Sequence, residues 1–177
     1  MKAVLRNVTL LALLAAVAGC LVDPVSAAPK GTASKLVDPL DRTSSCSVSN
    51  VSGIAFTVPY DPTQDVNDDA NGGFTVSCSG GRGNTTIQMM LSAGDAGKCY
   101  PTRYMDGPAG ATLNYNAFMG PAYRNIWGDG ACGEKSQQHI IPKNGHVDFI
   151  IYGRIPRGQR NARPGQYGDS LTLTLVP

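Results

Sequence analysis

The chain has 177 residues, of which 42% are hydrophobic, so it can bury the core of one domain. Fifteen Lys and Arg residues nearly balance thirteen Asp and Glu residues, which gives a formal net charge of +2. This balance argues against nucleic acid as a partner, because proteins that bind polyanions concentrate positive charge. The 21 glycines and 12 prolines are typical of a turn-rich β protein.

The N-terminal segment 1–27 has the pattern of a secretory signal peptide. Lys2 and Arg6 form a basic start, and an apolar stretch covers residues 8–18. Small residues at 25–27 suit cleavage after Ala27. The apolar stretch is too short for a membrane-spanning helix, which needs about 20 residues. We therefore expect export and removal of this segment.

A second interpretation of the same segment concerns Cys20. Residues 17–20, Val-Ala-Gly-Cys, are similar to a bacterial lipobox, in which the cysteine is lipidated and becomes the first residue of the mature chain. Only under this interpretation do we expect a membrane anchor. The mature chain begins at Cys20 or at Ala28, and in both cases Cys20 lies outside the folded domain.

Residues 28–45 are polar and loosely patterned, and they include Pro29, Gly31 and Pro39. This composition predicts a flexible N-terminal arm. The folded domain is expected over residues 46–177.

After Cys46 the sequence becomes a series of short runs in which apolar and polar residues alternate, separated by turn residues. The segment 63–73 is rich in Asp, Asn and Gly and is expected to be a loop. No segment has helical periodicity, so we predict an all-β fold, an antiparallel β-sandwich. The predicted strands cover residues 54–58, 74–78, 87–91, 103–105, 113–117, 147–151 and 171–175.

The last of these runs places Leu171, Leu173 and Leu175 on one face and Thr172 and Thr174 on the other. The alternation predicts a half-buried strand. A terminal strand with an open apolar edge invites pairing with another chain. We therefore expect another protein molecule to cover it.

Four cysteines remain when Cys20 is excluded, and an exported domain with four cysteines is expected to carry two disulfides. Three pairings can be drawn. We favour Cys46–Cys78 and Cys99–Cys132, because each would join elements expected to be neighbours. No Cys-x-x-Cys pair is present, which argues against a zinc site.

Candidate catalytic residues are few. His139 and His146, together with Asp148, are candidates for a metal site, but Asn144-Gly145 favours a tight hairpin turn that puts His146 and Asp148 on the polar side of a strand. Cys132 with His139 is a candidate thiol–base pair, for which a cystine is the favoured alternative. We predict no catalytic, cofactor-binding or metal-binding residues.

Two charged groups have simple interpretations. Asp65, Asp68 and Asp69 are candidates for weak calcium binding, but their spacing does not match an EF-hand loop. Four arginines cluster in one Gly- and Pro-rich stretch, which is expected to be a solvated loop. They are Arg154, Arg157, Arg160 and Arg163.

An ordered set of short sequence words resembles the spore coat protein U domain family, which includes secreted bacterial coat proteins and subunits of archaic chaperone–usher pili. The set spans nearly all of residues 46–176. The words are CSVS at 46, VSC ending at 78, LSAG at 91, RYM at 103, LNYNAF at 113, IWGDG at 126, IYGRIPRGQ at 151 and PGQYGDSLTLTL at 164.

The resemblance implies an immunoglobulin-like sandwich that lacks its final strand. The groove edge would be formed by Leu171, Leu173 and Leu175. A periplasmic chaperone would fill this groove first, and the N-terminal arm of another subunit would replace it after delivery to an outer-membrane usher. In this chain the donor arm would use Leu36, Val37 and Leu40, although Pro39 cannot donate to a ladder.

The leading hypothesis is a non-enzymatic structural subunit, secreted through the periplasm to a bacterial cell surface, pilus, spore coat or biofilm, which polymerises by donor-strand complementation. An alternative is a surface adhesin or carbohydrate-binding tip module with a stacking platform of tyrosines. The platform would consist of Tyr100, Tyr104, Tyr115 and Tyr123. A third hypothesis, an exported hydrolase, would depend on His139 or His146.

Overall fold

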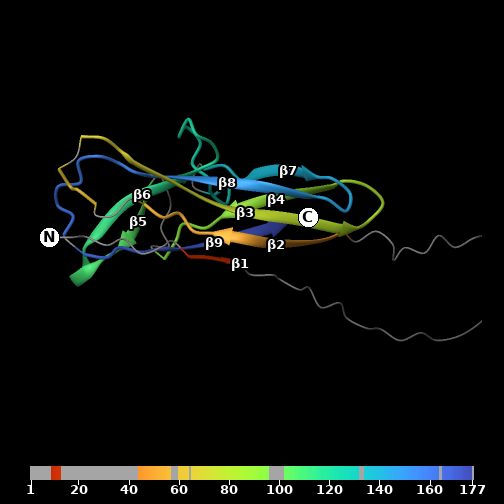
Figure 1. Cartoon of the computed structure of the whole chain (residues 1–177), viewed down its shortest axis with the longest axis horizontal. Helices are drawn as coiled ribbons and strands as arrows, with labels where there is room; N and C mark the ends of the chain where they lie inside the picture. Colours follow the sequence, from red (N-terminus) through yellow and green to blue (C-terminus); the bar gives the residue numbers. More distant parts are fainter. Residues whose placement is uncertain are drawn as a thin grey trace, which may run out of the picture.

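The computed structural model of the chain describes residues 9–12, 44–56, 60–63, 65–95, 102–131, 134–163 and 165–176, and of residues 9–12 it describes the backbone. Two β-sheets form a sandwich (Figure 1). The larger sheet has the order β2-β3-β8-β6-β5, with β2 Ser44–Ser52, β3 Asp68–Gly80, β8 His146–Ile155, β6 Thr112–Phe118 and β5 Arg103–Asp106. The smaller sheet has the order β1-β9-β4-β7, with β1 Thr9–Ala12, β9 Ser170–Val176, β4 Thr85–Leu91 and β7 Gln137–Ile141.

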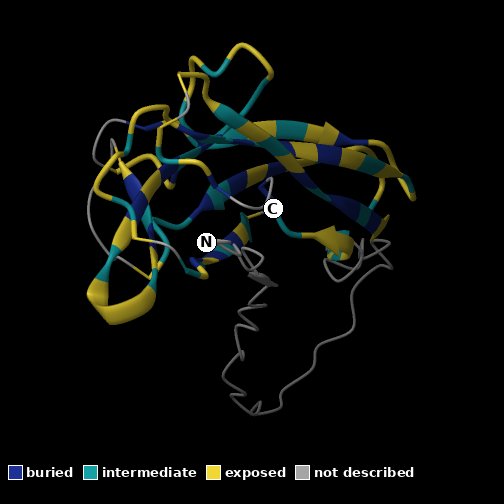
Figure 2. Ribbon diagram, turned by 60° about the vertical axis from the view of Figure 1, so that its left-hand side comes forward, coloured by how far each residue is buried: buried dark blue, intermediate teal, exposed yellow. Residues whose placement is uncertain are grey.

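The core lies between the sheets and follows from the alternation in the sequence. Strands with period-two patterns turn their apolar residues inward, and the banded colouring of these strands in Figure 2 reflects that alternation. Among the strands that the structure describes, all pairs are antiparallel except β1 with β9. Buried residues from the two facing sheets include Ile87, Met89, Leu91, Leu171 and Leu173 from one and Phe74, Val76, Leu113, Tyr115 and Ile151 from the other.

The predicted all-β fold is confirmed, and six of the seven predicted runs lie within observed strands. The one helical element among the described residues is a single 3-10 turn, Pro108–Gly110. Within these residues no helix has both the length and the apolar character needed to cross a membrane.

The prediction of a loop over residues 63–73 is wrong in its second half, because β3 begins at Asp68 and pairs with β8 over its whole early part. The Asp69 carboxylate accepts two hydrogen bonds from the Arg154 guanidinium, at 2.6 and 2.7 Å. Gly73 lies where the backbones approach closely, since a Cβ there would be 2.8 Å from the Phe149 carbonyl oxygen. Polar residues and glycines therefore form a strand here through a cross-strand ion pair and close packing.

The predicted strand over residues 54–58 is wrong for its described residues, 54–56. Ile54 and Phe56 are buried and pack against Gly153, but they lie outside the ladder. The pairing of β2 with β3 becomes irregular between Ser49 and Ser52, and β2 then ends. Burial alone accounts for the apolar pattern of this run.

The turn at Asn144-Gly145 is present, but it does not join a hairpin. The Gly145 N–H donates to the Pro142 carbonyl at 2.9 Å, and Asn144, the third residue of the turn, has a φ of 51°, which asparagine tolerates. The strand before the turn, β7, pairs with β4, whereas β8 pairs with β3 and β6. The turn therefore carries the chain from one sheet to the other, and the sequence analysis missed β7, which buries only Ile141 completely.

A disulfide joins Cys46 on β2 to Cys78 on β3, as predicted. The two residues are direct partners in the antiparallel ladder, with their Cα atoms 4.1 Å apart. The bond therefore ties the edge strand β2 covalently to the sheet. Cys20, Cys99 and Cys132 lie outside the described residues, so the second predicted disulfide stays a prediction.

Replacing Cys46 and Cys78 together by Ala is expected to lower the free energy of unfolding by about 2–4 kcal/mol, because the bond closes a loop of 32 residues and restricts the unfolded chain. Urea unfolding of the double variant against the oxidised parent measures the difference. An unchanged unfolding midpoint would contradict a structural role for this bond.

Candidate subunit-interaction site

β9 has the predicted two faces. Leu171 and Leu173 are buried against the core, Leu175 is half-buried, and Thr174 is exposed. β4 covers one edge of β9 in antiparallel register. Whether β9 can pair with a strand of another chain therefore depends on what lies along its other edge.

Strand β1 lies along that other edge. It runs parallel to β9, from Thr9 opposite Ser170 to Ala12 opposite Leu173, and it also contacts β2 (Figure 1). We call this position, between residues 170–173 of β9 and strand β2, the β9 strip. The expectation that the chain itself leaves this edge uncovered is wrong while residues 9–12 are present. However, β1 belongs to the segment 1–27 that is expected to be removed.

The β9 strip needs main-chain partners as well as cover for its leucines. On the β4 side, the Ser92 N–H donates to the Thr172 carbonyl and the Thr172 N–H donates to Ser92 Oγ, both at 2.9 Å. Alternate residues of a strand point their main-chain groups to opposite edges. Leu171 and Leu173 therefore direct theirs toward β1, and a buried group left without a partner costs about 1–3 kcal/mol.

A buried polar cluster holds the beginning of β9, and we call it the anchor cluster. Arg103, 1% exposed, donates from Nη2 to the carbonyls of Ser92 and Trp127, at 2.8 and 2.6 Å. Its Nε also donates to the Ser92 carbonyl, at 3.0 Å. These bonds connect β5 of the larger sheet to the end of β4 in the smaller sheet. The cluster consists of Ser92, Arg103, Tyr115, Trp127 and Asp169.

Asp169 is the second charged member of the anchor cluster and immediately precedes β9. One of its carboxylate oxygens accepts from the backbone N–H groups of Asp95 and Ser170, at 2.7 and 2.8 Å. The other accepts from the Tyr115 hydroxyl at 2.6 Å. Gly94, with a φ of 84°, packs so close that any Cβ there would overlap the carboxylate. The position of the first residue of β9 is therefore fixed by several hydrogen bonds.

Burial dominates the ionisation of this pair. Burial raises the pKa of Asp169, and the hydrogen bonds from Tyr115, Asp95 and Ser170 oppose that rise. Burial also raises the pKa of Tyr115, and the nearby Asp169 charge raises it further. The tyrosine therefore stays a neutral donor.

The sequence analysis missed the anchor cluster as a unit, although every member lies in one of the family-like words. Trp127 is buried and donates from Nε1 to the Met89 carbonyl at 3.2 Å. Tyr167 is also buried, and its hydroxyl donates to the Arg163 carbonyl at 2.6 Å. A charged residue inside a short apolar run, such as Arg103, was the signal that could have revealed the cluster.

The two histidines lie in different sheets. The half-buried ring of His139, on β7, packs edge-on against Phe149 with the ring centroids 5.1 Å apart. His146, on β8, is exposed, as predicted. Within the described residues no group of three or more His, Cys, Asp or Glu side chains could hold a metal ion.

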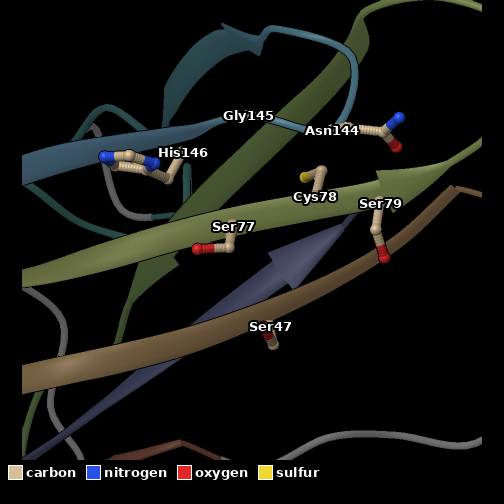
Figure 3. A pocket seen from close by; sticks show the side chains of 7 residues that line it. All are labelled: Ser47, Ser77, Cys78, Ser79, Asn144, Gly145 and His146. Carbon is tan, nitrogen blue, oxygen red and sulfur yellow. The ribbon is translucent and has the colours of Figure 1, made fainter.

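His146 lines a shallow pocket of about 270 Å³ over the larger sheet (Figure 3). Ser77 is its partner across the strands, but among the described residues no hydrogen bond joins the two side chains. The carboxylate of Asp148 accepts from the Thr75 hydroxyl at 2.6 Å, so it does not orient His146. Among the described residues of this pocket, no hydrogen bond joins the His146 ring to a carboxylate or to a serine. Its lining is Ser47, Ser77, Cys78, Ser79, Asn144, Gly145 and His146.

The predicted tyrosine platform does not form as a set. Tyr115 is completely buried and belongs to the anchor cluster, and Tyr100 lies outside the described residues. Tyr123 stacks on the Arg154 guanidinium, 3.6 Å from its ring centroid. Arg154 in turn pairs with Asp69, so this arginine and this aspartate serve a cross-strand contact.

The predicted donor residues Leu36, Val37 and Leu40 lie outside the described residues, as does the rest of the arm up to residue 43. Ser44 and Ser45, expected at the end of the arm, instead begin β2.

The family profile described as Spore Coat Protein U domain matches residues 31–174. Among solved structures, the chain is similar to a chain in the crystal structure of the CsuC–CsuE chaperone–tip adhesion subunit pre-assembly complex from archaic chaperone–usher Csu pili of Acinetobacter baumannii. The two are 17% identical with a TM-score of 0.50, over 76% of this chain and 40% of that one. This chain thus spans less than half of that protein, and the likeness shows the immunoglobulin-like sandwich fold. No curated protein sequence matches the chain.

Asp169→Asn is expected to change how stability depends on pH. Because the folded pKa of Asp169 is raised, its contribution is fully present below the unfolded value near 3.8 and is lost as the pH rises through the folded value. The stability of the parent relative to Asp169→Asn should therefore decrease from pH 4 toward neutrality. Tyr115→Phe removes a hydrogen bond that lowers this pKa, so its stability should decrease over a wider range of pH. Urea unfolding at several pH values measures both, and parallel profiles for all three proteins would contradict the assignment.

Proposed function

Because the chain belongs to the Spore Coat Protein U domain family, we propose that it is an exported structural subunit of a bacterial surface assembly, a spore coat or an archaic chaperone–usher pilus, whose subunits join by donor-strand complementation. It is not an enzyme in this proposal. The observation that carries the proposal is the β9 strip. Among the described residues, the one strand that occupies the strip is β1, and β1 lies outside residues 31–174, which the family profile matches.

Removal of residues 1–27 would leave an incomplete sandwich. The side chains of Leu171 and Leu173 would then be less well covered, and burial of each contributes about 1.5–3 kcal/mol to stability. The main-chain groups of the same two residues would lose their hydrogen-bond partners. A strand from another molecule restores both at once, since ladder hydrogen bonds supply affinity and alternate side chains supply register. A subunit built in this way is stable only when a partner strand is present.

The proposed partners follow from this requirement. A periplasmic chaperone protects the strip after export, an outer-membrane usher receives the complex, and another subunit's arm, through Leu36, Val37 and Leu40, replaces the chaperone. The similar chain comes from the crystal structure of a chaperone–tip adhesion subunit pre-assembly complex, which supports a chaperone as the first partner. Pro39 interrupts the arm of this chain, so a related subunit with an unbroken donor segment would bind the strip more tightly.

Chain 28–177 should be stabilised by a synthetic peptide of residues 28–45, and more strongly by the same peptide with Pro39→Val. A ligand that binds only the folded state adds about 2.7 kcal/mol when present at 100 times its Kd. The thermal midpoint as a function of peptide concentration measures this effect.

Two variants of β9 provide the matched control. Leu175→Asp places a charge on the face of β9 that packs against the core, and it should abolish the peptide effect. Thr174→Asp places the same charge on the exposed face, and it should leave the effect intact. If both peptides leave the midpoint of the parent unchanged and no fibres form, donor-strand complementation is excluded.

A further inference from the structure

The outer face of the smaller sheet carries no charged side chain on its strands β4, β7 and β9, and we call it the neutral face. Three apolar residues lie on it: Ile140 and Val176 are 58% and 42% exposed, and Met90 is half-buried. The outer face of the larger sheet, by contrast, carries charged residues such as Asp69 and Arg154. The neutral face consists of Thr86, Gln88, Met90, Gln138, Ile140, Ser170, Thr172, Thr174 and Val176.

This composition is typical of an interface. Single apolar residues scattered over a surface are normal, but here three of them share one sheet face that also lacks charge. Depletion of charged residues is the compositional mark of the core of a protein–protein contact. The neutral face therefore has the composition of a surface that packs against another protein.

The neutral face has a hollow on one side and an exposed apolar side chain on the other. The hollow lies where β4 meets β7 and has a volume of about 650 Å³. Gln88 on β4 is opposite Gln138 on β7 and, at its other edge, opposite Val176 on β9, so the three residues form one row across the sheet. The lining of the hollow is Thr86, Gln138, His139 and Ile140.

We propose that the neutral face packs against the same face of a second copy of this chain, so that subunits of neighbouring fibres or coat layers associate side by side. A two-fold axis along β4 would place β9 of each copy over β7 of the other, as a self-complementary contact requires. Val176 of each copy would then lie over Gln138 and the hollow of the other, with the two sheets about 10 Å apart. This inference rests on the proposed function, because it assigns a second contact surface to the same assembly.

The chemistry of the neutral face favours a second copy as its partner. Two copies of an uncharged face meet without the like-charge repulsion that keeps charged surfaces apart. Glutamine and threonine side chains each carry both donors and acceptors, so Gln88, Gln138 and Thr174 can pair with their own kind. A strongly charged partner would find no opposite charge on this face.

The size of the face predicts a weak contact that acts through repetition. β4 has seven residues, which extend over about 23 Å, and three strands are about 14 Å wide, so the face covers on the order of 300 Å². A stable pair buries about 800 Å² on each partner. One pair of faces therefore associates weakly, whereas many pairs along two assemblies bind together through multivalency. Strand exchange would join subunits within a fibre, and the neutral face would join the fibres.

The experiment uses the exported protein saturated with the 28–45 peptide carrying Pro39→Val, which fills the β9 strip and stops donor-strand polymerisation. Sedimentation equilibrium up to millimolar protein concentration should show weak dimers. Ile140→Asp should raise the Kd of the dimer by about tenfold or more, because it places an unpaired charge in the contact. Ile150→Asp is the matched control, since Ile150 is 51% exposed on the outer face of the larger sheet, and it should leave the Kd unchanged.

A pair of complementary charges tests the two-fold arrangement. Gln138→Glu and Val176→Lys should each weaken the dimer, and an equimolar mixture of the two variants should return the Kd toward the parent value. This recovery requires that position 138 of one copy lies opposite position 176 of the other, and a misfolded variant would not recover. In the absence of peptide, electron microscopy should show bundled fibres for the parent and for Ile150→Asp, and single fibres for Ile140→Asp.

The outcomes separate this contact from the proposed function. If the parent with a filled strip stays monomeric at millimolar concentration, or if Ile140→Asp and Ile150→Asp behave alike, the neutral face is excluded as a contact and donor-strand complementation stands. If the mixture of variants shows no recovery, the two-fold arrangement is overturned. If the peptide does not stabilise the protein and Ile140→Asp still abolishes the dimer, the proposed function fails and the neutral-face contact stands.

Discussion

The structure depends on the double role of Leu171 and Leu173 in β9. Their side chains complete the core between the sheets, and their main-chain groups point into the strip between β9 and β2. A sandwich can leave a polar edge strand in water, but it cannot leave a strand with buried leucines and unpaired peptide groups without a large loss of stability. The requirement for a strand in this position links the fold, the N-terminal segment 1–27 and the proposed partners.

The anchor cluster fixes the position at which β9 begins. Arg103 joins the end of β4 to the larger sheet, and Asp169 holds the residue that precedes β9. Because the Ser92 carbonyl accepts from Arg103, the Ser92 hydroxyl accepts from Thr172 in its place. The start of β9 is thus held by buried hydrogen bonds that do not involve the strand beside it. In the proposed donor-strand exchange, an incoming strand would meet a surface whose start is already held in place, which would lower the ordering cost of binding.

The sequence predicted the elements whose signal is local. Leu171 to Leu175 alternates strictly, and the favoured pairing of Cys46 with Cys78 joins elements that were expected to be neighbours. It did not predict β3 from Asp68, because that segment is stabilised by a distant arginine, Arg154. It also missed the contact between Tyr115 and Asp169, which lie 54 residues apart in the chain. Such contacts depend on how the sheets stack, and alternation within a single run carries no information about stacking.

The cross-link between Cys46 and Cys78 has a mechanical consequence. In the proposed assembly, tension would enter each domain along the strand that lies beside β9, parallel to the ladder between that strand and β9. Load in that direction shears many hydrogen bonds at once and does not open them one after another. Because the disulfide joins β2 to β3, the strand β2 beside the strip cannot separate from the five-stranded sheet under the same load.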